Sequence, residues 1–143
     1  MPEPYCLAMV LCDGIHRDAA TGKFTILGTF STFFARQFPA HAQLAVYFAV
    51  TDGLGPTVLR LRIVDADFGI SNSSEEPGKA ICEKEQEVTF DSPLVVMESA
   101  WSFATVLPKP GLYHCELFAG DELLMSRRML AVHAEANEGE SDA

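Results

Sequence analysis

The stretch "TVLRLRIVD", residues 57–65, carries the clearest structural signal in this chain. Leu59, Leu61 and Ile63 alternate with Arg60 and Arg62. Successive side chains of a β-strand point to opposite faces of a sheet, so this pattern predicts a strand with one apolar face and one basic face. We expect the apolar face to pack on a core and the arginines to face solvent.

The same alternation recurs along the chain. In "GLYHCELFAG", residues 111–120, Tyr113, Cys115 and Leu117 are predicted to point inward, with the intervening His and Glu outward. Turn residues separate such runs, as in "TDGLGP" at 51–56 and "AGDE" at 119–122. We predict strands near residues 4–12, 22–33, 42–51, 56–66, 79–90, 94–106, 111–119 and 122–132.

About eight short strands with turn signals between them predict an all-β fold, an antiparallel β-sandwich that is immunoglobulin-like in the broad sense. The length of 143 residues fits one domain, which we place at residues 1–133. The acidic run "AEANEGESDA", residues 134–143, is predicted to be a disordered tail. The first strand, near 5–12, is apolar on both faces, which suits a central strand or an edge covered by a partner.

The charge balance narrows the classes of partner. There are 20 acidic and 10 basic residues, a net charge of −10, which argues against binding to nucleic acid or to an anionic membrane. No basic leader with a cleavage site is visible, and no run approaches the roughly 20 apolar residues that span a bilayer. We therefore expect a cytoplasmic protein.

The four cysteines fit the same compartment. Cys6, Cys12, Cys82 and Cys115 form no C-x-x-C pair. In a cytoplasmic protein they are most simply buried, reduced thiols.

Three segments together resemble a known family. They are "LCDGIHRDAATGKFTILGTFSTFFARQFP" at 11–39, "LRLRIVDAD" at 59–67 and "PGLYHCELFAGDELL" at 110–124. They resemble an uncharacterised bacterial family of small single-domain proteins, a domain of unknown function. The resemblance implies no activity, so no site residue is carried over from it. The third segment is also similar to the last hairpin of immunoglobulin-like bacterial sandwiches, which implies fold rather than function.

The stretch "LCDGIHRDAATGKFTILGTF", residues 11–30, is rich in side chains that can bind metals. Asp13, His16 and Asp18, joined by Asp65 and Asp67 from a second loop, offer ligands for a cation such as calcium. However, the loop lacks the spacing of a calcium-binding loop and carries basic side chains of its own. Asp-Gly and Thr-Gly pairs are typical of turns. We therefore predict a strand–turn–strand unit with no metal ligand.

Catalytic motifs are not evident. Cys12 and His16 are close in sequence, but Cys12 ends an apolar strand, and the side chains of His114 and Cys115 diverge if they lie in a strand. The sequence contains no H-E-x-x-H, G-x-S-x-G or glycine-rich nucleotide motif. We predict a protein that is not an enzyme, with no catalytic residue and no cofactor.

The segment "FSTFFARQFP", residues 30–39, is the most suggestive of recognition. Phe30, Phe33, Phe34 and Phe38 either pack internally or leave some apolar surface exposed. We predict a non-enzymatic protein-interaction or self-assembly module that uses residues 5–12 or 30–38 with a protein partner or a second copy.

Two alternatives remain open. One is a small-ligand or carbohydrate-binding sandwich that uses aromatic side chains, for which the candidates are Tyr5, Tyr47, Trp101 and Tyr113. The other is a calcium-binding sandwich that uses the Asp-containing loops.

Overall fold

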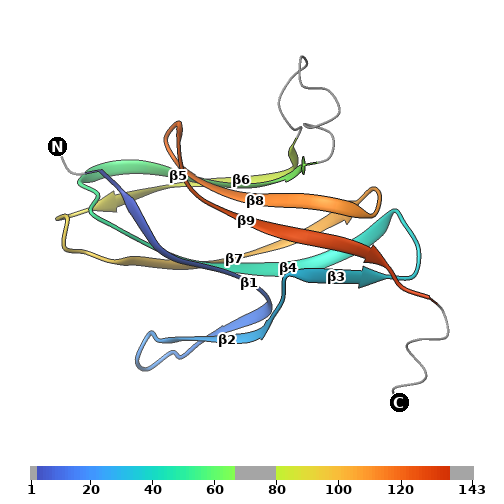
Figure 1. The fold of residues 1–143 in the computed structure, drawn as a ribbon. Coiled ribbons are helices and arrows are strands. Elements are labelled where there is room, and N and C mark those ends of the chain that lie inside the picture. Colours follow the sequence, from blue (N-terminus) through green and yellow to red (C-terminus); the bar gives the residue numbers. More distant parts are fainter. Residues whose placement is uncertain (1–2, 67–79, 136–143) are drawn as a thin grey trace.

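The computed structural model describes residues 3–66 and 80–135, which form nine strands (Figure 1). The strands are β1 Tyr5–Arg17, β2 Phe24–Thr29, β3 Thr32–Ala35, β4 Ala40–Thr51, β5 Gly55–Asp65, β6 Ala80–Phe90, β7 Met97–Leu107, β8 Gly111–Ala119 and β9 Glu122–His133. Asp67 and most of the predicted acidic tail lie outside the described residues.

The strands form two sheets. Sheet A has four strands in the order β2-β1-β4-β7, and sheet B has five in the order β3-β9-β8-β5-β6. All strand pairs are antiparallel except β3 with β9, which is parallel. The predicted β-sandwich is therefore confirmed.

The order of the strands is immunoglobulin-like. β1, β4 and β7 occupy the places of strands A, B and E, and they face a sheet in which β5, β8 and β9 take the places of C, F and G. β6 extends the second sheet beside β5, as an additional strand does in variable-type domains. β3 joins the same sheet on the outer side of β9.

Alternating residues from both sheets fill the core as the sequence predicts. Leu59, Leu61 and Ile63 are fully buried. Tyr113, Cys115 and Leu117 of β8 lie beside them on the inner face of sheet B, and in sheet A Phe48 packs edge-to-face on Trp101, with ring centroids 4.9 Å apart. Such pairs contribute about 0.5–1.5 kcal/mol beyond the area that they bury.

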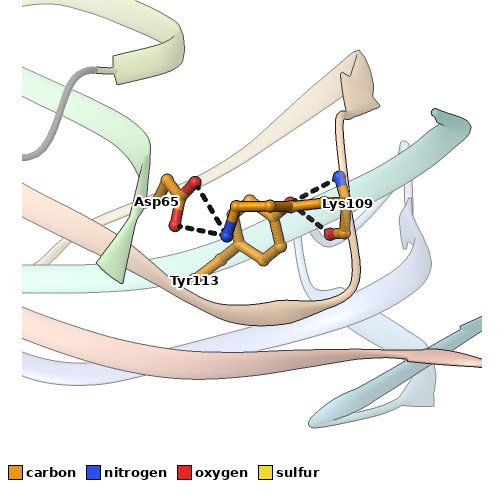
Figure 2. Close-up of polar contacts among 3 residues, drawn as sticks. All are labelled: Asp65, Lys109 and Tyr113. Carbon is orange, nitrogen blue, oxygen red and sulfur yellow. Dashed lines mark hydrogen bonds and ion pairs between the residues drawn. The ribbon is translucent and has the colours of Figure 1, made fainter. Parts of the chain in front are cut away.

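A buried tyrosine fixes the loop that enters β8 (Figure 2). The Tyr113 hydroxyl donates to the Lys109 carbonyl oxygen at 2.5 Å and accepts from the Lys109 N–H at 3.3 Å. A tyrosine near the start of strand F that bonds backbone upstream, two residues before a cysteine, is a hallmark of immunoglobulin domains. Tyr113 and Cys115 occupy these positions, whereas β4 contains no cysteine to pair with Cys115.

The predicted strand 22–33 is wrong as a single element. The chain leaves sheet A after β2 and enters sheet B as β3. At the crossing the Phe30 N–H bonds the Leu11 carbonyl at 3.2 Å, and the Leu130 N–H bonds the Ser31 carbonyl at 3.0 Å. One continuous apolar pattern thus serves two sheets, so the structure has nine strands where the sequence predicts about eight.

The first strand is also longer than predicted, because β1 continues past Cys12 to Arg17. Its distal half and β2 form an arm that folds back over the outer face of sheet A and lies below β1 and β4 in Figure 1. The Phe24 ring contacts Tyr47 edge-on at 5.6 Å, and Cys12 and Ala45 are buried on this outer face. Near the arm both faces are therefore covered at Leu11 and Cys12 of β1 and at Ala45 and Val46 of β4, whereas Tyr5 and Leu7 at the start of β1 are exposed.

Candidate functional site

The four phenylalanines of the 30–38 segment separate into two groups. Phe30, Phe33 and Phe38 are partly buried and pack against the core. Phe34 points outward from β3 and is 65% exposed. Three of the four phenylalanines therefore pack internally, and Phe34 is the one among them that lies at the surface.

Phe34 belongs to a surface built from two segments that are distant in sequence. Thr32 pairs with Leu130, and Leu130 pairs with Leu112 of β8, so these side chains share the outer face of sheet B with Phe34. Leu130 is 43% exposed. We call this surface the β3–β9 face and define it by Ser31, Thr32, Phe34, Leu112, Arg128 and Leu130.

Two hollows border Arg128. One has a volume of about 320 Å³ and is lined by Ser31, Thr32, Leu112, Arg128 and Leu130. The other has a volume of about 430 Å³ and is lined by Met9, Val10, Leu11, Thr29, Phe30, Ser31, Arg127 and Arg128. Because Ser31 and Arg128 line both hollows, the two lie next to each other, and together we call them the depression around Arg128.

Arg127 spans the open side of the sandwich between the two sheets. It lies opposite the buried Cys115 in the register, so its side chain points between the layers, where Nε donates to the Met9 carbonyl at 2.9 Å. Over Tyr5–Leu11, β1 has no second neighbouring strand in the described part of the chain, and this contact caps its exposed backbone.

The depression is locally basic in an acidic protein. None of the ion pairs found among the described residues involves Arg127 or Arg128. Arginine presents its donors in a planar fork that matches a carboxylate, so the Arg128 guanidinium is suited to an acidic group next to an apolar one.

The arginines of β5, Arg60 and Arg62, are engaged within the protein instead. They flank the Phe118 ring at 4.6 and 5.1 Å from its centroid. Arg62 also pairs with Glu116 at 2.9 Å, and Arg60 with Glu83 at 3.4 Å. The predicted outward orientation of both arginines is correct, and their charges are largely matched.

The 11–30 stretch forms the predicted strand–turn–strand unit. The Asp18 carboxylate accepts from the Thr21 N–H at 2.8 Å and from its hydroxyl at 2.7 Å, and these bonds lower the pKa of Asp18. The Gly22 N–H bonds the Asp18 carbonyl at 2.7 Å. Arg17 donates to the Gly22 carbonyl and lies 5.2 Å from the Phe24 ring centroid.

The other metal candidates are dispersed. Asp13 lies against Gly28 in the arm, whereas Asp65 is in sheet B, where it pairs with the Lys109 ammonium at 3.3 Å (Figure 2). His16 pairs with Thr25 in the arm, and Asp67 falls outside the described residues. No group of three His, Cys, Asp or Glu side chains that could hold a metal occurs in the described part of the chain.

The candidate nucleophiles lie in unreactive surroundings. Burial raises the pKa of Cys6, Cys12 and Cys82, and it raises the pKa of Cys115 to about 12. All four cysteines are free thiols. Cys115 points into the core while its neighbour His114 is half-buried on the outer face, as the alternation predicts.

The aromatic residues considered for sugar binding do not share a surface. Trp101 and Tyr113 are buried in the core. Tyr47 packs on Phe24 and donates to the Glu98 carboxylate at 2.5 Å, and the pKa of Tyr47 is raised to about 12, mainly by burial and then by Glu98. Tyr5 is 59% exposed at the start of β1, where it pairs with Thr51.

The pattern of one protein family matches residues 7–133, which is most of the chain. The chain belongs to the family of unknown function DUF6941. A search of curated protein sequences finds no match to this DUF6941 chain. Over the described residues, no helix has the length and apolar character needed to cross a membrane.

Two solved structures are similar to the DUF6941 chain. An immunoglobulin-like protein from Pseudomonas aeruginosa is 13% identical with a TM-score of 0.43, and the match covers 91% of this chain and 97% of that one. Beta-D-glucoside glucohydrolase from Trichoderma reesei is 13% identical with a TM-score of 0.42, and the match covers 92% of this chain but 19% of that one.

Proposed function

We propose that this protein is a non-enzymatic interaction module that binds an extended segment of a protein partner at the β3–β9 face. The observation that carries the proposal is Phe34, a large aromatic side chain that is 65% exposed on a strand of sheet B. Beside it lie the exposed Leu130 and the depression around Arg128. Buried aromatic anchors and arginines are the side chains that most often dominate the energy of protein interfaces.

The backbone presents Phe34 rigidly. β3 has only four residues, but it is held at both ends by hydrogen bonds to the β9 side. The Leu130 N–H bonds the Ser31 carbonyl at 3.0 Å, and the Ala134 N–H bonds the Ala35 carbonyl at 2.8 Å. A fixed strand loses little conformational freedom on binding, so most of the free energy gained by covering Phe34 is available for affinity.

The chemistry of the face defines the partner. Phe34, Leu112 and Leu130 fit a large apolar side chain, and Arg128 fits a carboxylate a few residues away in an extended segment. The net charge of −10 does not prevent this, because salt screens distant charges over about 8 Å at physiological ionic strength. We therefore propose a partner segment that combines a large apolar residue with a nearby Asp or Glu. The four free thiols are compatible with such an encounter in the cytoplasm.

A displayed library of random peptides, selected against the purified protein, tests the proposal. Enriched peptides should share a large apolar residue and an acidic residue. Burying a Phe side chain stabilises a complex by about 1.5–3 kcal/mol, so Phe34→Ser should weaken the selected peptides by about 10–100-fold. Arg128→Glu should weaken them as well, with recovery when the acidic residue of the peptide is changed to Lys.

Leu94→Ser is the matched control, because Leu94 is 90% exposed but lies in the loop between β6 and β7. It should bind the selected peptides like the parent protein. The proposal is wrong if selection enriches no common pattern, or if the peptides bind Phe34→Ser as tightly as the parent.

A further inference from the structure

β7 is a long edge strand that lacks the usual protection against pairing. It pairs with β4 without a break from Met97 to Leu107, and no other strand in the described part of the chain pairs with its second side. Its sequence, "MESAWSFATVL", contains no proline and one charged residue, Glu98. Its outward positions Ser102, Ala104 and Val106 are exposed.

The other free edges among the described strands each have a feature that disfavours pairing with a further strand. β3 has four residues and β2 has six, with Gly28 near its end at a φ of +69°. β6 carries the charged run "EKEQE" at 83–87. The free part of β1 has a register shift between Cys6 and Ala8, and its Met9 carbonyl accepts a hydrogen bond from Arg127. Proteins use such short strands, charges and bulges to prevent pairing between edges. The edge of β7 lacks these features apart from Glu98, so it is open to pairing with another strand.

We propose that two copies of this chain associate through β7, paired antiparallel about a two-fold axis at Ser102, so that the two A sheets become one continuous sheet. An isologous contact of this kind requires a strand that is complementary to itself. On this register the opposed residues are Met97 with Leu107, Glu98 with Val106, Ser99 with Thr105, Ala100 with Ala104, Trp101 with Phe103, and Ser102 with its own copy.

The register keeps the charged residues apart. Each Glu98 faces a Val106, and the two Glu98 side chains are separated along the strands by roughly 27 Å at the rise per residue of an antiparallel strand. The Tyr47 hydroxyl already holds the Glu98 carboxylate, so this group has a partner on its own chain. The remaining outward contacts join small side chains, Ala100 with Ala104 and Ser102 with Ser102, which permit close approach of the two strands.

The acidic β6 strand limits the affinity. β6 is the edge of sheet B on the same side of the sandwich as β7, so the two-fold brings the two β6 strands toward each other. Glu85 and Glu87 then repel their counterparts. Because salt screens such repulsion, the β7 dimer should become tighter as ionic strength rises.

Sedimentation equilibrium of the full chain over a range of protein and salt concentrations tests the proposal. The parent protein should show a monomer–dimer equilibrium that shifts toward dimer with added NaCl. Ser102→Lys places two lysines opposite each other and should raise the dimer dissociation constant at least about tenfold, because opposed like charges cost several kcal/mol. Ser126→Lys, the same change at an exposed residue of β9, should leave that constant unchanged.

Two double variants test the register and guard against a failure of Ser102→Lys to fold. Ala100→Glu with Ala104→Lys places opposite charges across the two-fold and should retain the dimer. Ala100→Lys with Ala104→Lys places like charges there and should abolish it. A monomer at all concentrations, or a dimer that survives both Ser102→Lys and the Lys–Lys pair, overturns the proposal. Because the β3–β9 face lies on the other sheet, loss of the β7 dimer should not change peptide binding by Phe34, so the two proposals fail separately.

Discussion

Replacing Tyr113 by Phe tests whether the Tyr113 hydroxyl holds the loop before β8, a contact that is typical of immunoglobulin domains. The change keeps the buried ring but removes the hydroxyl that binds both the N–H and the carbonyl of Lys109. Each such bond contributes about 0.5–1.5 kcal/mol net, and a buried group left without a partner costs about 1–3 kcal/mol. We expect the free energy of unfolding to fall by about 2 kcal/mol, which for a domain of this size lowers the melting temperature by roughly 8 °C.

Urea denaturation followed by tryptophan fluorescence, together with thermal melting, measures this effect. Tyr5→Phe is the control, because Tyr5 is 59% exposed, and it should change stability by less than about 0.5 kcal/mol. Lys109→Ala separates the backbone anchor from the ion pair with Asp65, since it keeps the backbone bonds and removes only the pair between the half-exposed Lys109 ammonium and the largely buried Asp65 carboxylate. A Tyr113→Phe protein within about 0.5 kcal/mol of the parent would refute the reasoning.

Three further predictions follow from the turns and the thiols. A Cβ at Gly53 would lie 2.6 Å from the buried ring of Phe90, so Gly53→Ala should lower the free energy of unfolding by about 1–3 kcal/mol in denaturant titrations, and an unchanged midpoint contradicts that packing. Because its bonds to Thr21 lower the pKa of Asp18, these bonds stabilise the folded protein fully at a pH above the unfolded-state pKa of the carboxyl. This stabilisation is lost as the pH falls through the lower folded-state pKa. The difference in melting temperature between the parent and Asp18→Asn should therefore shrink on acidification, with no effect of millimolar calcium, and a difference that grows at low pH or a calcium-dependent shift would sink this interpretation. Cys82, the least buried thiol, should react first with a disulfide reagent in the native protein, as judged by mass spectrometry of the labelled peptides, and faster labelling of any other cysteine would show that burial does not control reactivity here.

The local pattern of residues predicts most strands well but not their division between sheets. Leu59 and Leu61 alternate with arginines, and both the strand and its inward face follow from that spacing. The break between β2 and β3 does not follow from the spacing, because the alternation continues through Phe30 while the backbone passes from one sheet to the other. The position of the break depends instead on two hydrogen bonds between residues distant in sequence, from the Phe30 N–H to Leu11 and from the Leu130 N–H to Ser31.

The candidate site was predictable only in part for the same reason. The cluster of phenylalanines indicates a surface for recognition, but only the pairing of β3 with β9 determines that Phe34 points to solvent. Arg128 and Leu130 carry no signal of their own in the sequence, since their proximity to Phe34 arises from a parallel pair between the early and last strands. The free edge of β7 likewise depends on strand order, although its near absence of charge is visible in the sequence.

The most direct test of the central claim is to map, by NMR, where a selected peptide binds the isotope-labelled protein. If the β3–β9 face is the interaction site, amide shifts on titration should concentrate in residues 31–35 and 128–133 and should disappear in Phe34→Ser. Shifts that concentrate instead in the loop containing Leu94, in the β1–β2 arm or along β7, and that persist in Phe34→Ser, would contradict the account.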